Sequence, residues 1–325
     1  MEQPRRAWLV IAAALLLVRP GAALAQDYPS KPVRLIVADA PGGAPDQLAR
    51  IVAQKLSEAL GQQVVVDNKP GAAGILGAEA AARAGPDGYT LLLSTTAIWA
   101  IMPSVKKSLP YDAVTSFEPI TRIATTSNVL VVHPELPARS VAELVALAKA
   151  SPGRINYASA GLASPAHLAG EMLNLLGDVK MTHIPYKGAA PALLDVIAGS
   201  VQLIITSPVA AGGHMASGKV RALATTGAQR NPGLPDLPTI GETLPGYDIS
   251  QSWGVVAPAG TPPAILRRLQ AEITKAMADP EVRERVAKTG AVPLSESPAA
   301  FTAFMQAERQ RLGQVISRSG IVLTD

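Results

Sequence analysis

The sequence predicts an α/β fold with two lobes, each built on a mostly parallel sheet that helices flank on both faces. Short apolar runs typical of buried strands alternate along the chain with patterns typical of helices. The alternation falls into two sets, one within residues 27–118 and one within residues 128–226. Because repeated β-α-β order favours parallel strands covered by helices, each set predicts one lobe.

The first set begins with a buried strand, which a Pro-Gly-Gly turn joins to a long amphipathic helix. Apolar residues keep helical spacing through this helix, and Gly61 ends it. The strands of this set are expected over 33–37, 64–66 and 90–93, and its helices over 46–60 and 78–84.

The second set repeats the pattern and carries clear helix start signals. Ser140 and Glu143 form a capping box for a helix through Ala150, and Ser164-Pro165 starts another helix as N-cap and first residue. Further helices are expected near 190–199 and 208–217. The strands of this set are expected over 128–132, 156–158, 181–185, 201–206 and 220–225.

The last third of the chain predicts how the lobes are joined. Residues 226–250 are rich in Pro, Gly and Thr and have the character of a long return connection, after which residues 249–257 cross back to the first lobe. Two crossings between lobes make a hinge. We therefore expect lobe 1 to comprise residues 26–123 and 251–325, with a helical C-terminal part, and lobe 2 to comprise residues 124–250.

The N-terminus has the layout of a secretory signal peptide over residues 1–25. Arg5 and Arg6 precede a 12-residue apolar run over 7–18, and an Ala-x-Ala site at 23–25 precedes Gln26. The run is too short to span a membrane, which takes about 20 apolar residues. The sequence therefore predicts an exported protein, which is most simply periplasmic.

Composition excludes several function classes. Cleavage after Ala25 would remove three arginines and one glutamate, which lowers the formal net charge from +4 to +2 and leaves no basic footprint for nucleic acid. The chain has no cysteine, so disulfides, thiolate metal sites, a cysteine nucleophile and a lipoprotein anchor are excluded. It has no Walker A, HExxH or GxSxG motif, and its four histidines lack metal-pair spacing. We expect no enzyme activity, no cofactor and no bound metal.

The strongest candidate site is the turn formed by Pro41, Gly42, Gly43 and Ala44, between a strand and a helix. Glycines let backbone N–H groups approach a ligand, and a helix N-terminus carries partial positive charge, so such a turn can hold a carboxylate or phosphate. It lies at the carboxyl end of a strand, where open α/β sheets bind ligands. An ordinary βα turn is the alternative, and Asp46 is interpreted as a capping residue.

A similar strand-to-helix segment in the second lobe contains Ser159, Ala160, Gly161, Ser164 and His167. Its hydroxyls and N–H groups could converge on an anion, with His167 in the first helical turn. Simple structural roles compete, since Ser164 fits an N-cap and a lone histidine more often makes a structural hydrogen bond. The glycine-rich segment over 71–77 is interpreted as a turn with close packing, because it lacks the dinucleotide spacing.

Motifs in the same order along the whole mature chain resemble the Bug/TctC family, the periplasmic solute receptors of tripartite tricarboxylate transporters. The motifs include YPSKPVRLIV at 28–37, NKPGA at 68–72, PDGYTLLL at 86–93, NYASAG at 156–161, PYKGA at 185–189, LPDLPT at 234–239 and APAGTPP at 257–263.

The resemblance implies a type II-like periplasmic binding protein, hinged by two crossing strands, with a carboxylate held in the cleft by backbone N–H groups, hydroxyls and waters. It places Pro41–Ala44 and Ser159, Ala160, Gly161 and Ser164 at the site, with Thr95 and Asn128 as weaker candidates whose alternative is loop capping. The implied partners are a small carboxylate and the membrane components of the transporter, or a sensor domain, with the receptor itself a monomer.

Thr206 is a departure from relatives that bind amino acids, which resemble one another in having an aspartate at that strand end. Thr206 cannot supply that charge, so we expect a ligand without an amino group: a dicarboxylate, a hydroxy acid or an aromatic carboxylate. Trp99 is interpreted as core because its segment is apolar all round, although a cleft-facing indole would stack on an aromatic ligand. The position of Trp253 stays open.

A second function remains in view at this stage. An exported α/β hydrolase would use Ser159 or Ser164 as a nucleophile with His167 as its base. That arrangement needs a base within about 2.6–3.2 Å of the hydroxyl and a third group that orients it.

Overall fold

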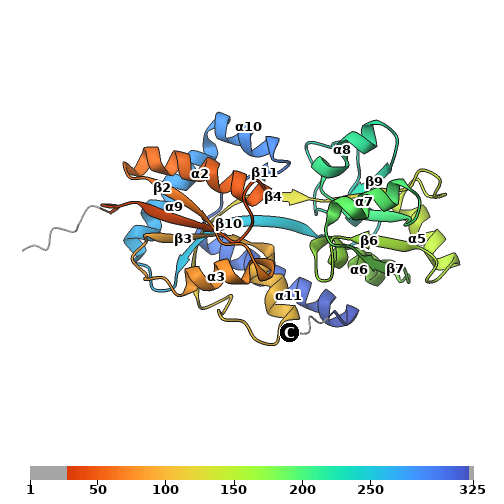
Figure 1. Cartoon of the computed structure of the whole chain (residues 1–325), viewed down its shortest axis with the longest axis horizontal. Coiled ribbons are helices and arrows are strands. Elements are labelled where there is room, and N and C mark those ends of the chain that lie inside the picture. The colour runs from red at the N-terminus through yellow and green to blue at the C-terminus, as the bar shows by residue number, and fades with distance from the viewer. Residues whose placement is uncertain (1–27, 322–325) are drawn as a thin grey trace, which may run out of the picture.

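The computed structural model describes residues 28–321, which form two lobes side by side along the long axis of the molecule (Figure 1). The predicted signal peptide at 1–25 therefore lies outside the described residues. We call the body around the six-stranded sheet lobe 1 and the body around the five-stranded sheet lobe 2. Strands β4 and β10 run from one body to the other.

Lobe 1 is a mixed sheet in the order β11-β4-β10-β3-β1-β2. Its strands are β1 (Val33–Val37), β2 (Val64–Asn68), β3 (Thr90–Thr95), β4 (Phe117–Ser127), β10 (Ser250–Pro258) and β11 (Val292–Pro293). Its helical segments are α2 (Ala44–Leu60), η2 (Ala72–Gly74), α3 (Ile75–Ala82), η3 (Ala97–Ile101), α4 (Met102–Val105), α9 (Pro263–Ala278), α10 (Pro280–Lys288) and α11 (Pro298–Ser319).

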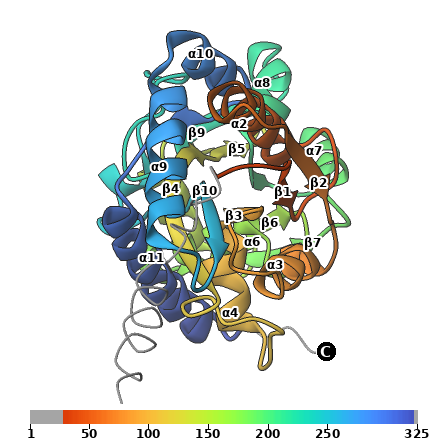
Figure 2. The ribbon, with the colours of Figure 1, turned by 90° about the vertical axis from the view of Figure 1, so that its left-hand side faces the viewer.

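Helices cover both faces of the lobe 1 sheet (Figure 2). Leu35 and Val37 of β1 point to one face and pack in a core with α2, α9 and α10, whereas Ile36 points to the other face, toward α3 and η3. Successive side chains of a strand alternate between faces, and β1 is apolar at every buried position because both faces are covered.

Lobe 2 is a smaller mixed sheet in the order β7-β6-β8-β5-β9. Its strands are β5 (Val129–Val132), β6 (Asn156–Ser159), β7 (Thr182–Pro185), β8 (Leu203–Thr206) and β9 (Arg221–Thr225). Its helical segments are α5 (Val141–Ala150), α6 (Pro165–Gly177), α7 (Ala189–Ile197), α8 (Pro208–Ala216) and η4 (Ile240–Glu242).

The two-lobed α/β prediction is confirmed, but both sheets are mixed rather than mostly parallel. Strands β1, β2 and β3 are parallel to one another, as are β6, β7 and β8. Strands β10 and β5, which enter their sheets from the crossing, run antiparallel to their neighbours. A strand that arrives from the other lobe enters at the carboxyl edge of the parallel strands, so its direction is reversed.

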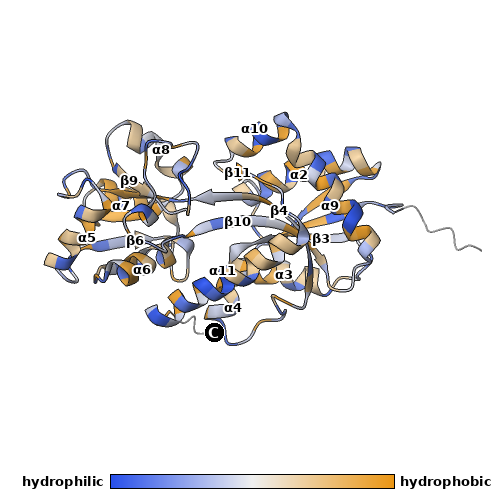
Figure 3. Ribbon diagram, turned by 180° about the vertical axis from the view of Figure 1, so that it is seen from behind, coloured by the Kyte–Doolittle hydropathy of each residue, from blue (hydrophilic) through white to orange (hydrophobic). Residues whose placement is uncertain are grey.

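This topology turns the carboxyl ends of both parallel sets toward the crossing. Thr95, the last residue of β3, pairs with Trp253 near the start of β10, and Thr206, the last residue of β8, pairs with Val129 at the start of β5. The strand ends of one lobe therefore face those of the other. The crossing parts of β4 and β10 are less hydrophobic than the strands inside each lobe (Figure 3).

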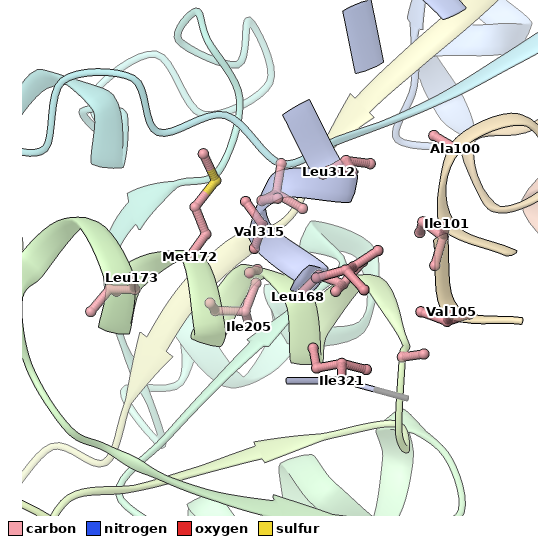
Figure 4. Close-up of a cluster of buried hydrophobic side chains, with 14 of the residues drawn as sticks. Ala100, Ile101, Val105, Leu168, Met172, Leu173, Ile205, Leu312, Val315 and Ile321 are labelled. Carbon is pink, nitrogen blue, oxygen red and sulfur yellow. The ribbon is translucent and has the colours of Figure 1, made fainter. Parts of the chain in front are cut away.

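Helix α11 adds a third connection between the lobes. It packs on lobe 1 through η3 and β4, and on lobe 2 through α6. Leu312 and Val315 of α11 meet Leu168 and Met172 of α6 in one buried apolar cluster (Figure 4). The lobes are therefore held together in two ways: by the covalent chain of the crossing strands and by the apolar surface that this contact buries.

Candidate functional site

A cavity of about 420 Å³ lies between the facing edges of the two lobes. Lobe 1 supplies one wall, the crossing strands supply the floor, and the start of α8 supplies part of the opposite wall. The lining residues used below are Asp39, Gly42, Ala44, Asn128, Ser207, Gln251, Trp253, Lys288 and Gly290.

The lobe 1 wall contains a helix N-terminus without a side-chain cap. The N-cap of α2 is Gly43, which has no hydroxyl or carboxylate to offer, and Gly42 before it has a φ of +89° that favours glycine. No hydrogen bond within residues 28–321 uses the N–H of Gly43 or Ala44. These two N–H groups, at the positive end of a 17-residue helix, can therefore donate hydrogen bonds to an anion.

Asp46 holds this turn rather than opposing an anion. Its Oδ2 accepts the N–H of Gly42 at 2.9 Å and the Nε–H of Arg50 at 3.0 Å, and its side chain is almost fully buried. The hydrogen bond from Arg50 keeps the pKa of Asp46 below its usual range. The capping interpretation of Asp46 is wrong in detail: the N-cap is Gly43, and Asp46 instead accepts the N–H of Gly42, which lies before the helix.

A second irregular turn lies at the end of β2. Four successive residues, 71–74, have positive φ angles, including 48° at Ala72 and 54° at Ala73. The interpretation of 71–77 as a close-packed turn is confirmed, since a Cβ added at Gly77 would lie 2.6 Å from the Ala38 Cβ. Small residues here bring α3 against the end of β1, next to the cavity wall.

The lobe 2 segment makes its hydrogen bonds internally. Ser164 accepts the N–H of His167 at 3.3 Å and donates to the carbonyl of Gly161 at 2.7 Å, which is the N-cap role that competed with ligand binding. The Nδ1 atom of His167 accepts the N–H of Ala163 at 3.0 Å, so this histidine holds the turn that leads into its own helix.

Two histidine rings are stacked behind this segment. His167 and His183 lie with ring centroids 3.8 Å apart, and His183 Nε2 lies 2.6 Å from the hydroxyl of fully buried Ser159. Burial lowers the pKa of His183 to about 4, and the nearby His167 adds to the effect. Burial also lowers the pKa of His167. Both rings are therefore neutral near pH 7 and serve as packing and hydrogen-bonding groups.

The sequence-predicted site residues fall into two groups. Gly42, Ala44 and Asn128 line the cavity. The others lie at the same facing edges but outside its lining, and Thr95, Thr206, Ser159 and His167 are buried. This second group comprises Pro41, Gly43, Thr95, Ser159, Ala160, Gly161, Ser164, His167 and Thr206.

Several lining residues were missed by sequence reasoning. Asp39 lies two residues after the end of β1, and its place beside a strand carboxyl end could have identified it, because strand carboxyl ends form the site. Ser207 is the N-cap of α8, which the Ser207-Pro208 pair signals. Gln251 and Lys288 come from the crossing strand and α10, and only the tertiary structure places them here.

The two tryptophans have different surroundings. Trp99 is 3% exposed and meets Phe301 edge-on at 5.4 Å, so the core interpretation is confirmed. Trp253 is also buried, but it is one of the residues that line the cleft cavity. Within residues 28–321, no group of three or more histidine or acidic side chains is placed to hold a metal ion. None of the helices in that range is long and apolar enough to cross a membrane.

Comparison with known proteins decides the family. Residues 48–321 match the model of the tripartite tricarboxylate transporter family receptor, TctC. The chain belongs to this family. It is 37% identical over 314 residues to the UPF0065 protein in the tcbD-tcbE intergenic region of Pseudomonas sp. strain P51, which covers 96% of this chain and 93% of the relative. It is also 37% identical to protein BugT of Bordetella pertussis, with 92% of each chain covered.

Solved structures of receptors in this family share the fold. Rpa4515 of R. palustris with adipate is 36% identical, with a TM-score of 0.77 over 91% of this chain and 99% of the other. MatC of Rhodopseudomonas palustris with bound malate is 29% identical, with a TM-score of 0.73 over 89% of this chain and 100% of the other. The periplasmic binding protein BugD is 34% identical, with a TM-score of 0.73 over 91% of this chain and 99% of the other. The chain is thus a member of a family of solute-binding receptors.

The two serines and His167 are not arranged as the hydrolase alternative requires. Ser159 lies beside His183 rather than His167, and its side chain is fully buried. Ser164 accepts a hydrogen bond from the backbone of His167 and donates its own proton to Gly161. Neither hydroxyl is paired with the imidazole of His167, which is occupied by Ala163.

Proposed function

We propose that this chain is a periplasmic receptor that captures a small carboxylate between its lobes and delivers it to the membrane components of a tripartite tricarboxylate transporter. Residues 26–123 and 251–325 form one lobe and residues 124–250 the other, and residues 1–25 direct export and are removed. A sensor domain is a second destination for the loaded receptor. The receptor acts as a monomer and needs no cofactor.

One observation carries the proposal: the uncapped N-terminus of α2 borders the cavity between the lobes. The N–H groups of Gly43 and Ala44 supply partial positive charge without a cationic side chain, which suits a carboxylate. Ser207 at the start of α8 and Asn128 on the crossing supply polar groups from the other sides. The relatives with adipate and with malate support a carboxylate ligand.

The ligand class follows from the strand ends. Thr206 ends β8 where an aspartate would receive an ammonium group, and its side chain is buried and uncharged. We propose that the ligand has no amino group directed at β8, which leaves dicarboxylates, hydroxy acids and aromatic carboxylates. Ser159, Ala160, Gly161, Ser164 and His167 would then approach the ligand when the lobes close.

The test is to denature the purified mature protein and identify the released small molecule by mass spectrometry. Thermal shift and calorimetry with carboxylates then measure binding to the refolded protein. An unaltered small acid that binds again supports a receptor. Conversion of that acid into a product by the protein, or no thermal shift with any carboxylate, would contradict the proposal.

A further inference from the structure

The cleft contains a carboxylate that has no counter-charge. Asp39 lies two residues after the end of β1, half-buried, and lines the cavity together with Gly42 and Ala44 of the α2 N-terminus. No hydrogen bond or ion pair within residues 28–321 involves its side-chain oxygens. Burial without such a partner raises the pKa of the Asp39 carboxyl.

The nearby cations are already engaged by other carboxylates. Arg50 is bound to Asp46, with Nη2 and Oδ1 3.0 Å apart. Lys288, which shares the cavity lining, lies 2.7 Å from Glu284 on its own helix. Neither cation therefore neutralises Asp39, and its oxygens remain open to a group that enters the cavity.

The backbone fixes where this carboxylate lies. The side-chain amide of Asn68 donates to the Asp39 carbonyl at 3.1 Å, and the N–H of Lys69 donates to the carbonyl of Val37 at 2.8 Å. Asp39 is thereby tied to the end of the neighbouring strand β2. A partly buried acid that is held in place beside an anion-binding turn is costly unless something donates to it.

We propose that Asp39 recognises a hydroxyl group of the ligand, carried next to the carboxylate that the α2 N-terminus holds. This inference rests on the proposed function and narrows its ligand class. A plain dicarboxylate would place only negative charge beside Asp39, whereas a 2-hydroxy acid presents a donor within the same few atoms. Asp39 thus acts as a specificity-determining residue on the lobe 1 wall.

The experiment is calorimetric titration of the mature chain with matched ligands that differ in one substituent. One series is succinate, malate and aspartate, and a longer series is adipate, 2-hydroxyadipate and 2-aminoadipate. Each series is repeated on Asp39→Asn, on Asp39→Ala and on Asp87→Asn. Asp87 is an exposed acid before β3, at the edge of the sheet opposite the cleft, so its substitution is the control for lost charge.

We expect the hydroxy member of a series to bind the parent protein about tenfold more tightly than the unsubstituted acid, which is typical of a hydrogen bond to a charged group. Asp39→Ala should remove that preference and bind the unsubstituted acid as well as the parent or better, whereas Asp39→Asn keeps an uncharged acceptor oxygen and should reduce the preference. Asp87→Asn should keep it. The amino member should bind the parent no more tightly than the hydroxy member, because the ligand class proposed above has no amino group.

Two negative outcomes are distinguishable. If carboxylates bind the parent and the ratio between series members is unchanged by both Asp39 substitutions, the role of Asp39 is overturned while the proposed function stands. If no carboxylate of either series binds the parent, the proposed function fails and this inference fails with it. Melting temperatures of the variants show that a lost preference does not come from unfolding.

Discussion

Both walls of the cleft are formed where a strand leads into a helix, but the N-termini of these helices are capped differently. In lobe 1, α2 starts at Gly43, which leaves the first N–H groups of the helix without a side-chain partner. In lobe 2, α6 and α8 start at Ser164 and Ser207, whose hydroxyls accept the N–H three residues on. The helix N-terminus of lobe 1 thus has free backbone N–H donors, whereas in lobe 2 some of these donors are bonded to the capping hydroxyls. We infer that lobe 1 holds the charge of the ligand and that lobe 2 contributes by closing over it.

The ionisable side chains of the two walls also differ. The lobe 1 wall carries an unpaired carboxylate at Asp39, whereas the lobe 2 wall rests on the stacked, neutral rings of His167 and His183. The facing edges of two similar lobes can thus serve ligand recognition in one lobe and rigid packing in the other. Substitutions in lobe 1 should change binding, and substitutions in lobe 2 should change stability.

The largest effect is expected from Gly170→Ala in α6. A Cβ at this position would lie 2.2 Å from the ring of Tyr157, which supports the histidine stack and is fully buried. Overpacking of this kind should lower the free energy of unfolding by about 3 kcal/mol, measured by urea denaturation. Gly212→Ala in α8, where a Cβ meets nothing within 4 Å, is the control and should be neutral or slightly stabilising. Equal effects of the two would mean that Tyr157 does not fix α6.

Gly42→Ala tests the free donors of lobe 1. The added Cβ has open space, but the φ of +89° disfavours any residue other than glycine by about 1–2 kcal/mol, so the turn should shift away from its anion-binding geometry. Carboxylate affinity should fall at least tenfold in calorimetry. Gly61→Ala carries a comparable strain at the far end of α2, with a φ of +67°, and should leave affinity unchanged. Unchanged affinity in Gly42→Ala would remove the lobe 1 turn from the site.

The histidine stack predicts a pH dependence of stability. The folded pKa of His183, about 4, lies below the ordinary histidine value of about 6.5, so the unfolded chain binds the proton more readily. The free energy of unfolding is therefore highest above about pH 6.5, where His183 is neutral in both the folded and the unfolded chain. It falls by on the order of 1–3 kcal/mol as the pH drops toward 4. The free energies of unfolding of the parent and of His183→Gln, measured by denaturation, should therefore approach each other as the pH falls over this range. A constant difference between them across pH 4–7, with His214→Gln as the control, would contradict the neutral stack.

The smallest effect is expected from Ser164→Ala, which separates capping from ligand contact. Loss of an N-cap hydroxyl costs about 1 kcal/mol of stability. Ser297 caps α11 in the same way, with its hydroxyl accepting the N–H of Ala300 at 3.1 Å, so Ser297→Ala should cost a similar amount. Neither substitution should weaken carboxylate binding more than about threefold, because the Ser164 hydroxyl is used within its own turn. A tenfold loss in Ser164→Ala alone would show that lobe 2 also binds the ligand directly.

Local patterns explain how much of the fold was predictable. The first strand, the capping of α5 by Ser140 and the start of α6 at Ser164 depend on neighbouring residues, and the structure has them as predicted. Helix α2 starts at Ala44 rather than Asp46, because Pro45 is tolerated in a first turn whose N–H groups need no helical partner. Strand β4, which runs from Phe117 to Ser127, was missed because its pairing with β10 is long-range.

The candidate site was predictable only in part, for the same reason. The α2 turn is a local signal, so Gly42 and Ala44 were found. Asp39 was missed although it lies two residues after a predicted strand, because the lack of a partner for its carboxylate is visible only in three dimensions. The stacking of His167 on His183 joins a helix to an edge strand, and nothing in the local sequence of either residue indicates it.

The most direct test of the difference between the walls is a titration of the ¹⁵N-labelled mature protein with malate, followed by backbone amide chemical shifts. We predict the largest shifts at the amides of Gly42, Gly43 and Ala44, with smaller changes over 160–164 as the lobes close. Large shifts confined to 160–164, with the amides of 42–44 unmoved at saturation, would contradict the assignment of the ligand charge to lobe 1.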